Sequence, residues 1–238
     1  MVNTLELRSL NGSLLIQGIT LLVNFFSLAT PLLPADVILK EILGLETIVQ
    51  IIELVFYSWY RATIFEKGSD LTRFRYYDWF ITTPIMLFST LCFYVYLDYQ
   101  EKNTKESNES QEPLSVQSIL TQYKWPILGI FILNALMLVF GYLQEINVIS
   151  IVSSSILGYL SLMGSFGILY TQFVQKVPNQ AGLFYIMFFV WSLYGVAAML
   201  PTLGKTISYN ILDIFAKNFY GIFLSYIIWQ KSTSVEPV

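Results

Sequence analysis

Seven long apolar stretches constrain the fold of this 238-residue chain more than any other feature. A helix needs about 20 predominantly apolar residues to cross the hydrocarbon core of a bilayer. Backbone N–H and C=O groups in lipid must be hydrogen-bonded within the segment, so each stretch is expected to be helical. The sequence therefore predicts an all-α membrane protein, a bundle of seven transmembrane helices that forms one domain over residues 1–238. The approximate stretches are 12–33, 37–63, 74–97, 119–142, 147–173, 180–202 and 207–229.

The composition supports a membrane protein and excludes several other classes. Charged residues make up 12% of the chain, whereas soluble domains carry about 25%. The formal net charge of −3 leaves no basic face for nucleic acid, so no such partner is expected. The chain has no histidine, and its one cysteine, Cys92, has no partner within the chain. Proton chemistry would therefore depend on carboxylates, tyrosines or lysine.

One long polar segment, about 98–118, separates the third and fourth stretches. It is rich in glutamate, asparagine, serine and lysine, a composition that is typical of a solvated loop. Seven spans place the two termini on opposite sides of the membrane. With the N-terminus outside and the C-terminus cytoplasmic, basic residues are nearly evenly divided between the two sides. We adopt that orientation as an expectation.

The last stretch carries two charges, Asp213 and Lys217, near its middle. They are four residues apart, so one helical turn brings the carboxylate next to the cation. Ionisable groups at membrane depth are costly and usually functional. One interpretation is a structural ion pair between helices. The other is a desolvated lysine amine that forms a Schiff base with a carbonyl compound.

The first two stretches place further polar groups on shared helical faces. Ser13 and Gln17 are four residues apart, and Glu46 and Glu53 are seven residues apart, or two turns. Such groups either make contacts between helices or line a polar track through the bundle.

The third stretch opens with Arg75, Asp78 and Thr82, whose spacing of three and four puts them on one face. Asp78 can act as a second counterion for a protonated lysine imine, and the Thr82 hydroxyl can bond that carboxylate. Pro84 predicts a local bend because it removes a backbone donor.

These motifs resemble those of the microbial (type 1) rhodopsins. Arg75–Pro84, with the sequence RYYDWFITTP, is similar to their third-helix signature, and Asp213–Lys217, DIFAK, to their seventh-helix motif. Trp191–Tyr194 is similar to their aromatic pair over the chromophore, with Gly195 where proline is usual. The motifs follow the family's order. The chain is most similar to the channelrhodopsin-like first group of viral rhodopsins from large algal viruses.

The resemblance implies that all-trans retinal lies in the bundle interior as a protonated Schiff base on Lys217. Its counterions would be Asp78 and Asp213, and Arg75, Thr82 and Tyr57 would complete the counterion region. No enzyme activity, catalytic residue or metal site is implied. The implied partners are the lipid bilayer and small cations (Na⁺, K⁺, H⁺), and a homo-oligomer is left open. The residues expected to line the polyene are Tyr76, Trp79, Thr83, Met86, Trp191 and Tyr194.

Within this family the activity has to be argued from individual positions. In the pumps a proton donor lies eleven residues after the acceptor, where this chain has Ser89, and serine cannot reprotonate the imine. Phe56 stands where proteorhodopsins have a histidine. The segment 200–206 holds no carboxylate, with Lys205 near the position of a glutamate. A fast outward proton pump is therefore disfavoured.

Channelrhodopsins carry glutamates at heptad spacing in their second helix and an asparagine after the retinal lysine, and Glu46, Glu53 and Asn218 match this arrangement. Ser13 is expected to complete a central gate with Glu46 and Asn218, and Glu53 and Arg75 to control the outer half. The leading hypothesis is a light-gated cation channel along helices one, two, three and seven. A weak outward proton pump and a photosensor that signals to a partner are the alternatives. The expected path residues are Ser13, Gln17, Glu46, Glu53, Asn210 and Asn218.

Overall fold

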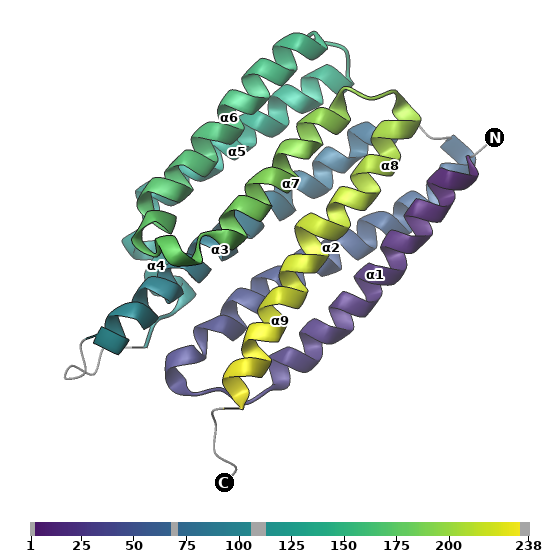
Figure 1. Cartoon of the computed structure of the whole chain (residues 1–238). Coiled ribbons are helices and arrows are strands. Elements are labelled where there is room, and N and C mark those ends of the chain that lie inside the picture. The colour runs from purple at the N-terminus through teal and green to yellow at the C-terminus, as the bar shows by residue number, and fades with distance from the viewer. Residues whose placement is uncertain (1–2, 68–70, 106–112, 234–238) are drawn as a thin grey trace.

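The computed structural model describes residues 3–67, 71–105 and 113–233. Within these ranges the secondary structure is helical, with no β-strand (Figure 1). Four short 3₁₀ turns lie at Pro34–Asp36, Thr72–Phe74, Val174–Lys176 and Pro178–Gln180. The longer elements are α1 (Thr4–Ala29), α2 (Ile38–Lys67), α3 (Arg75–Lys105), α4 (Val116–Gln122), α5 (Lys124–Glu145), α6 (Ile151–Gln172), α7 (Gly182–Ala198), α8 (Thr202–Asp213), the π-helical turn η5 (Ile214–Asn218) and α9 (Phe219–Ser232).

These elements form the expected seven-helix bundle, because α4 leads into α5 and because α8, η5 and α9 run on as one rod. Figure 1 shows the rods side by side, with the two chain ends at opposite ends of the bundle. Within the described residues, five rods are long and apolar enough to cross a membrane. The 30-residue α2 and the shorter apolar α7, with 17 residues, complete the bundle.

The third and first helices differ most from the predicted boundaries. The third helix continues to Lys105, so residues 98–105 of the predicted polar loop are helical, and an ion pair from Lys102 Nζ to Asp98 Oδ2 (2.8 Å) supports this extra turn. Residues 106–112 of that loop lie outside the described residues. The first helix runs over 4–29 rather than 12–33, because Asn3 caps it by accepting from the Leu5 N–H (2.8 Å). The polar composition of residues 4–11 and 98–105 gave no indication that they are helical.

The bundle interior differs sharply between its two sides. The buried face of α1 recurs every three or four residues, as for a packed helix, yet all but one of its members are polar: Glu6, Leu10, Ser13, Gln17, Thr20, Asn24 and Ser27. This face packs against α2, α8 and α9. In contrast, the buried face of α7 consists of Phe184, Met187, Val190, Trp191 and Ala197. The apolar residues of α1, such as Leu15 and Phe26, are exposed on the outer face that lipid would cover.

The last rod is interrupted by one wide turn. In η5 the Phe219 N–H donates to the Ile214 carbonyl, five residues back instead of four. Such a π turn accommodates one extra residue and often lies at a functional site. Lys217 is part of this turn and is 2% exposed.

Candidate functional site

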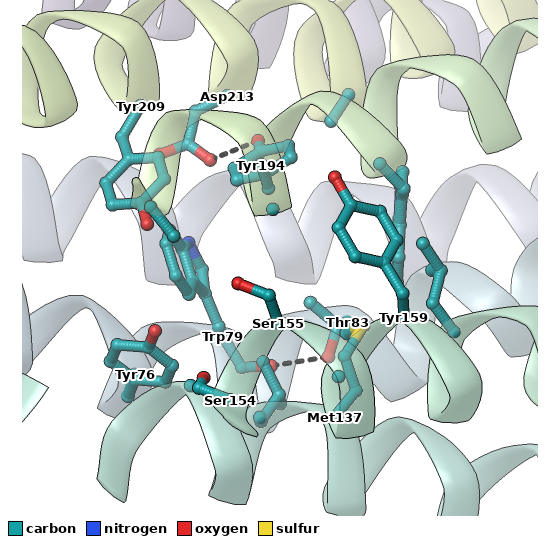
Figure 2. A pocket seen from close by; sticks show the side chains of 18 of the residues that line it. Tyr76, Trp79, Thr83, Met137, Ser154, Ser155, Tyr159, Tyr194, Tyr209 and Asp213 are labelled. Atoms are coloured by element: carbon teal, nitrogen blue, oxygen red, sulfur yellow. Dashed lines mark hydrogen bonds between the residues drawn. The ribbon is translucent and has the colours of Figure 1, made fainter. Parts of the chain in front are cut away.

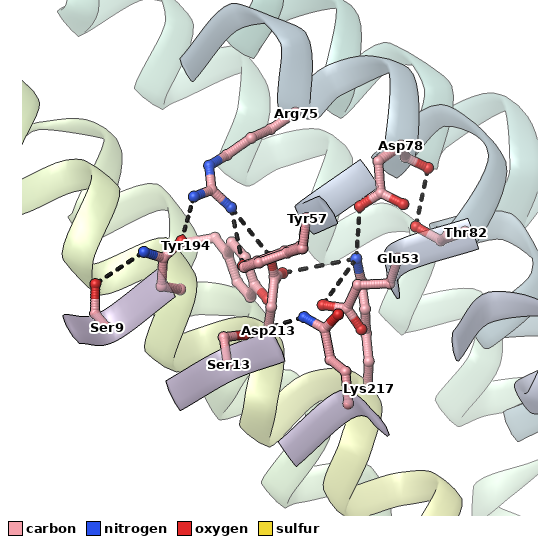
Figure 3. A network of polar contacts seen from close by, with 12 residues as sticks. Ser9, Ser13, Glu53, Tyr57, Arg75, Asp78, Thr82, Tyr194, Asp213 and Lys217 are labelled. Atoms are coloured by element: carbon pink, nitrogen blue, oxygen red, sulfur yellow. Dashed lines mark hydrogen bonds and ion pairs between the residues drawn. The ribbon is translucent and has the colours of Figure 1, made fainter. Parts of the chain in front are cut away.

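Three carboxylates surround the amine of Lys217 (Figure 3). Its Nζ lies 2.7 Å from Asp78 Oδ2, 3.6 Å from Glu53 Oε1 and 3.8 Å from Asp213 Oδ1. All four side chains are almost completely buried. A buried cation needs such partners, since an unpaired one would lose its hydration without compensation. The i,i+4 partner Asp213, expected from the helical spacing, is the most distant of the three.

Glu53 is a third carboxylate beside Lys217, and sequence reasoning did not expect it there. Its control of the outer half of a path stays a prediction, and the structure places its Oε1 3.6 Å from the Lys217 amine. Helical spacing predicted its face on α2 correctly, yet spacing cannot give the depth of the neighbouring helix. Neither of its carboxylate oxygens has a hydrogen-bond partner among the described residues.

Asp213 is held by three donors from three helices. Tyr57 and Tyr194 each donate a hydroxyl hydrogen bond of 2.6 Å to it, and Arg75 Nη1 lies 3.3 Å from its Oδ2. Arg75 also donates to the Tyr57 oxygen (3.0 Å) and makes a short hydrogen bond to Asn210 Oδ1. These charge-assisted hydrogen bonds hold the Asp213 carboxylate in one position, one helical turn before Lys217 in the chain.

Thr82 does not make its expected bond to the Asp78 carboxylate. Its hydroxyl donates instead to the backbone carbonyl of Asp78, four residues back, at 3.0 Å. Threonine within a helix commonly bonds the preceding turn in this way. The neighbouring Thr83 does the same with the Trp79 carbonyl, and it also accepts from Asn134 of α5 (2.8 Å). Sequence reasoning had no signal for Asn134.

A cavity extends from Lys217 between α3, α5, α6 and α7 (Figure 2). Its walls are mainly aromatic and apolar, and they include all six residues that sequence reasoning placed along the polyene: Tyr76, Trp79, Thr83, Met86, Trp191 and Tyr194. What these residues bind stays a prediction. The side of the cavity that α5 and α6 form was not predicted, and its residues are Met137, Leu138, Gly141, Ser154, Ser155, Gly158, Tyr159 and Leu162.

A close neighbour explains why this chain has Gly195 where the family usually has proline. A Cβ atom at this position would lie 2.6 Å from the ring of Tyr159. That tyrosine donates its hydroxyl to the Ser192 carbonyl (2.8 Å) and lines the cavity. Phe166 of α6 packs edge-on against Trp191 with ring centroids 5.4 Å apart. At residue 195 the cavity wall therefore differs from the family's usual one, because glycine leaves room for the Tyr159 ring.

The predicted central gate is not joined by direct contacts. Gln17 donates to Ser13 (3.0 Å), Asn218 reaches the Asp213 carbonyl (3.5 Å), and Glu46 accepts a short hydrogen bond from Ser89. Across the described residues, no hydrogen bond links Ser13, Glu46 and Asn218 to one another. Glu46 instead accepts from Ser89 of α3, and the central gate stays a prediction.

Buried polar side chains on α1, α2 and the last rod form a feature that we call the polar seam: Ser13, Gln17, Thr20, Asn24, Glu46, Gln50, Glu53, Asn218, Tyr220 and Ser225. The Asn24 and Ser225 side chains contact each other at 3.2 Å. Eight of the seam residues have at least one buried polar atom without a partner among the described residues: Gln17, Thr20, Asn24, Glu46, Gln50, Glu53, Asn218 and Tyr220. An unsatisfied buried group costs about 1–3 kcal/mol. Water is the simplest partner for so many groups.

Outside the seam, Lys205 has a partner that local sequence could not reveal. No carboxylate lies in segment 200–206, but Glu145 at the end of α5 places Oε1 2.6 Å from Lys205 Nζ. The pair is largely buried and ties α5 to α8.

The model of one protein family, described as bacteriorhodopsin-like protein, matches residues 9–231. The chain is a bacteriorhodopsin-like protein. Members of this family generally bind retinal through a lysine Schiff base, and most act as ion pumps, channels or sensors rather than as classical enzymes. The fold and its apolar helices make this bacteriorhodopsin-like protein an integral membrane protein that lies in a lipid bilayer.

Solved structures agree with this assignment and confirm the resemblance to viral members. The viral rhodopsin OLPVRII is 26% identical with a TM-score of 0.76, covering 96% of this chain and 99% of that chain. A blue light-absorbing proteorhodopsin from Med12 is 16% identical with a TM-score of 0.72, covering 97% and 99%. Xanthorhodopsin, described as a light-driven ion pump with dual chromophore, is 16% identical with a TM-score of 0.69, covering 97% and 94%. No curated protein sequence matches the chain.

Proposed function

We propose that this bacteriorhodopsin-like protein is a light-gated cation channel that holds all-trans retinal on Lys217. The cavity supports this cofactor, because its walls are mainly apolar and aromatic and include Lys217. An aromatic wall suits a conjugated polyene, and a buried amine suits a Schiff base. Bound retinal would supply light absorption and a change of shape at the lysine.

The residues around Lys217 have separate tasks in this proposal. Asp78, at 2.7 Å, is the primary counterion, and Asp213 is the second. Arg75, Tyr57 and Tyr194 hold Asp213 in place by the contacts described above. Trp79, Thr83 and Trp191 shape the cavity near the lysine, and Asn134 orients the Thr83 hydroxyl.

The polar seam is the observation that carries the channel proposal. It follows the bundle from Ser13 and Glu53, near the level of Lys217, to Asn24 and Ser225, nearer the C-terminal end. Its polar atoms without protein partners are best satisfied by water, and its carboxylates favour cations over anions. The proposed cargo is small cations (Na⁺, K⁺ and H⁺). The proposed orientation has the N-terminus outside and the C-terminus cytoplasmic.

The contacts of Lys217 connect the cavity to this seam. A displacement of the lysine nitrogen changes its 3.6 Å distance to Glu53, a seam residue, and its 2.7 Å contact with Asp78. Glu53 then turns toward water and the neighbouring seam residues, because its electrostatic partner has moved. The seam hydrates further, and cations can enter it.

Whole-cell voltage clamp in the presence of all-trans retinal tests the proposal. A channel gives a light-evoked current whose reversal potential follows the cation gradient when external Na⁺ is replaced by a large organic cation. The Glu46→Ala, Glu53→Ala and Asn218→Ala variants should then change conductance or selectivity. Unchanged currents and selectivity in all three variants would rule out the seam as the path.

One observation favours the pump as a second candidate. The donor position, Ser89, bonds the Glu46 carboxyl, so α2 brings to this place the acid that α3 lacks. A pump gives a current of one direction at every holding potential, and Glu46→Gln should then slow steady pumping while Ser89→Ala has a smaller effect. A reversing current that is insensitive to Glu46→Gln would exclude this alternative.

A further inference from the structure

Gln50 is the one amide of the seam with no hydrogen-bond partner among the described residues. It is fully buried, and neither its amide oxygen nor its amide nitrogen has a hydrogen-bond partner among the described residues. An unpartnered buried polar atom costs about 1–3 kcal/mol, and Gln50 has two of them. Its side chain therefore requires partners that are not protein groups. The function argued so far assigns it no task.

The position of Gln50 is defined by the two seam carboxylates. It follows Glu46 by four residues and precedes Glu53 by three, so the three side chains form one stripe on α2. Glu46 is bound to Ser89, and Glu53 lies 3.6 Å from the Lys217 amine. The rise of about 1.5 Å per residue puts Gln50 about 6 Å along the axis from the first carboxylate and about 4.5 Å from the second.

The helix packed along this stripe offers further oxygens. α1 lies against α2, and its buried face carries the Gln17 carbonyl oxygen and the Thr20 hydroxyl, both without partners among the described residues. Neutral oxygens between two acidic groups are the kind of ligand that a partly dehydrated Na⁺ or K⁺ takes in a channel. A proton wire has a different requirement, since an amide has no proton to exchange at neutral pH.

We propose that Gln50 is a cation ligand of the seam and sets its selectivity for metal cations over protons. This inference rests on the proposed channel function. The two glutamates supply the negative charge, and the Gln50 carbonyl oxygen replaces water in the gap between them. Because the amide interrupts the row of titratable groups, protons lose the direct relay that a third carboxylate would offer them.

Reversal potentials of three variants test this proposal. Gln50→Glu should raise the permeability to H⁺ relative to Na⁺ by about tenfold, and Gln50→Leu should lower the Na⁺ current by about tenfold. Gln50→Asn keeps the amide and should have a smaller effect than either. The control is Thr47→Val on the same helix, because the Thr47 hydroxyl already donates to the Leu43 carbonyl (2.7 Å). This control should leave selectivity unchanged. Unchanged reversal potentials in Gln50→Glu and Gln50→Leu would overturn the proposal.

A second measurement does not depend on current. A cation that binds the folded protein raises its thermal midpoint. In the dark, Na⁺ or K⁺ at constant ionic strength should stabilise the purified wild type relative to N-methyl-D-glucamine, and Gln50→Leu should lose this difference. Equal salt responses of wild type and variant would count against the site. A wild type without light-evoked current, but with this salt response, would instead sink the channel proposal and keep the cation site.

Discussion

The interiors of the two sides of the bundle have opposite chemical character. Around α5, α6 and α7 the interior is filled by aliphatic and aromatic side chains, and the aromatic cavity opens among them. Around α1 and α2 the interior is a row of amides, hydroxyls and carboxylates, several without protein partners. A membrane helix can keep an apolar outer face whether its inner face borders an apolar cavity or a row of polar groups. Here one side encloses an apolar space, and the other a row of polar groups, several without partners among the described residues.

Lys217 stands at the border between these sides. Its amine faces Asp78 and Glu53, whereas its stem forms part of the cavity wall. A single side chain is therefore shared by the ligand cavity and the seam. In the proposed function, this shared side chain carries a change in the cavity to the seam without a long chain of contacts.

The largest expected effect is loss of the chromophore in Lys217→Ala. Without the amine no Schiff base forms, and the visible absorption band of the retinal-treated protein should disappear. Absorbance before and after borohydride trapping checks this outcome. Lys102→Ala, at the exposed end of α3, is the matched lysine control and should keep its colour. A visible band that survives Lys217→Ala would place the attachment site elsewhere.

Next in size is the removal of Arg75, which joins α3 to α2 and α8. Arg75→Gln leaves the Asp213 carboxylate buried without its guanidinium, and breaking a buried pair costs about 3–5 kcal/mol. Thermal unfolding of the purified apoprotein measures the loss. The exposed pair Lys102–Asp98 is the comparison, since the substitution Lys102→Gln should cost less than about 1 kcal/mol. Equal effects of the two substitutions would mean that the Arg75 network contributes little.

On the aromatic side, Gly195→Ala should be destabilising. Its new methyl group would lie 2.6 Å from the Tyr159 ring, and overpacking of this kind costs about 1–3 kcal/mol. Gly167→Ala is the control, because nothing lies within 4 Å of its added atom. That change should be neutral or stabilise the helix by about 0.5–1 kcal/mol. The double variant with Tyr159→Leu should recover part of the loss, and no recovery would show that the clash has another cause.

The smallest expected effect is the difference in stability cost between two asparagine truncations, one on each side of the bundle. Asn134→Ala removes a hydrogen bond to Thr83 (2.8 Å) on the aromatic side, and Asn24→Ala removes the contact with Ser225 (3.2 Å) in the seam. The first should cost about 1–2 kcal/mol, because the Thr83 hydroxyl loses its donor beside a mainly apolar cavity. In the seam, water takes its place, and the cost should stay below about 1 kcal/mol. Denaturant or thermal unfolding in one detergent ranks them, and a reversed order would contradict a wet seam.

The sequence predicted the bundle and the residues around Lys217 well, because both depend on local signals. Apolar length predicts the helices, and spacings of three, four and seven residues predict shared faces for Asp78 and Asp213 with their neighbours. The position of Glu53 needed the depth of one helix relative to another. Thr82 had a backbone carbonyl as a closer alternative. The match of Tyr159 with Gly195 joins residues 36 apart, and no local pattern encodes it.

The π turn at Ile214–Asn218 gives the last rod a place where its backbone hydrogen bonding can shift. The rod contains one residue more than a regular helix of the same span needs, and the surplus is confined to the turn that carries Lys217. A surplus residue of this kind can pass to the next turn by exchanging one long backbone hydrogen bond for a shorter one. The lysine can therefore swivel about the helix axis while Thr202 and Ser232, at the two ends of the rod, keep their depths in the membrane.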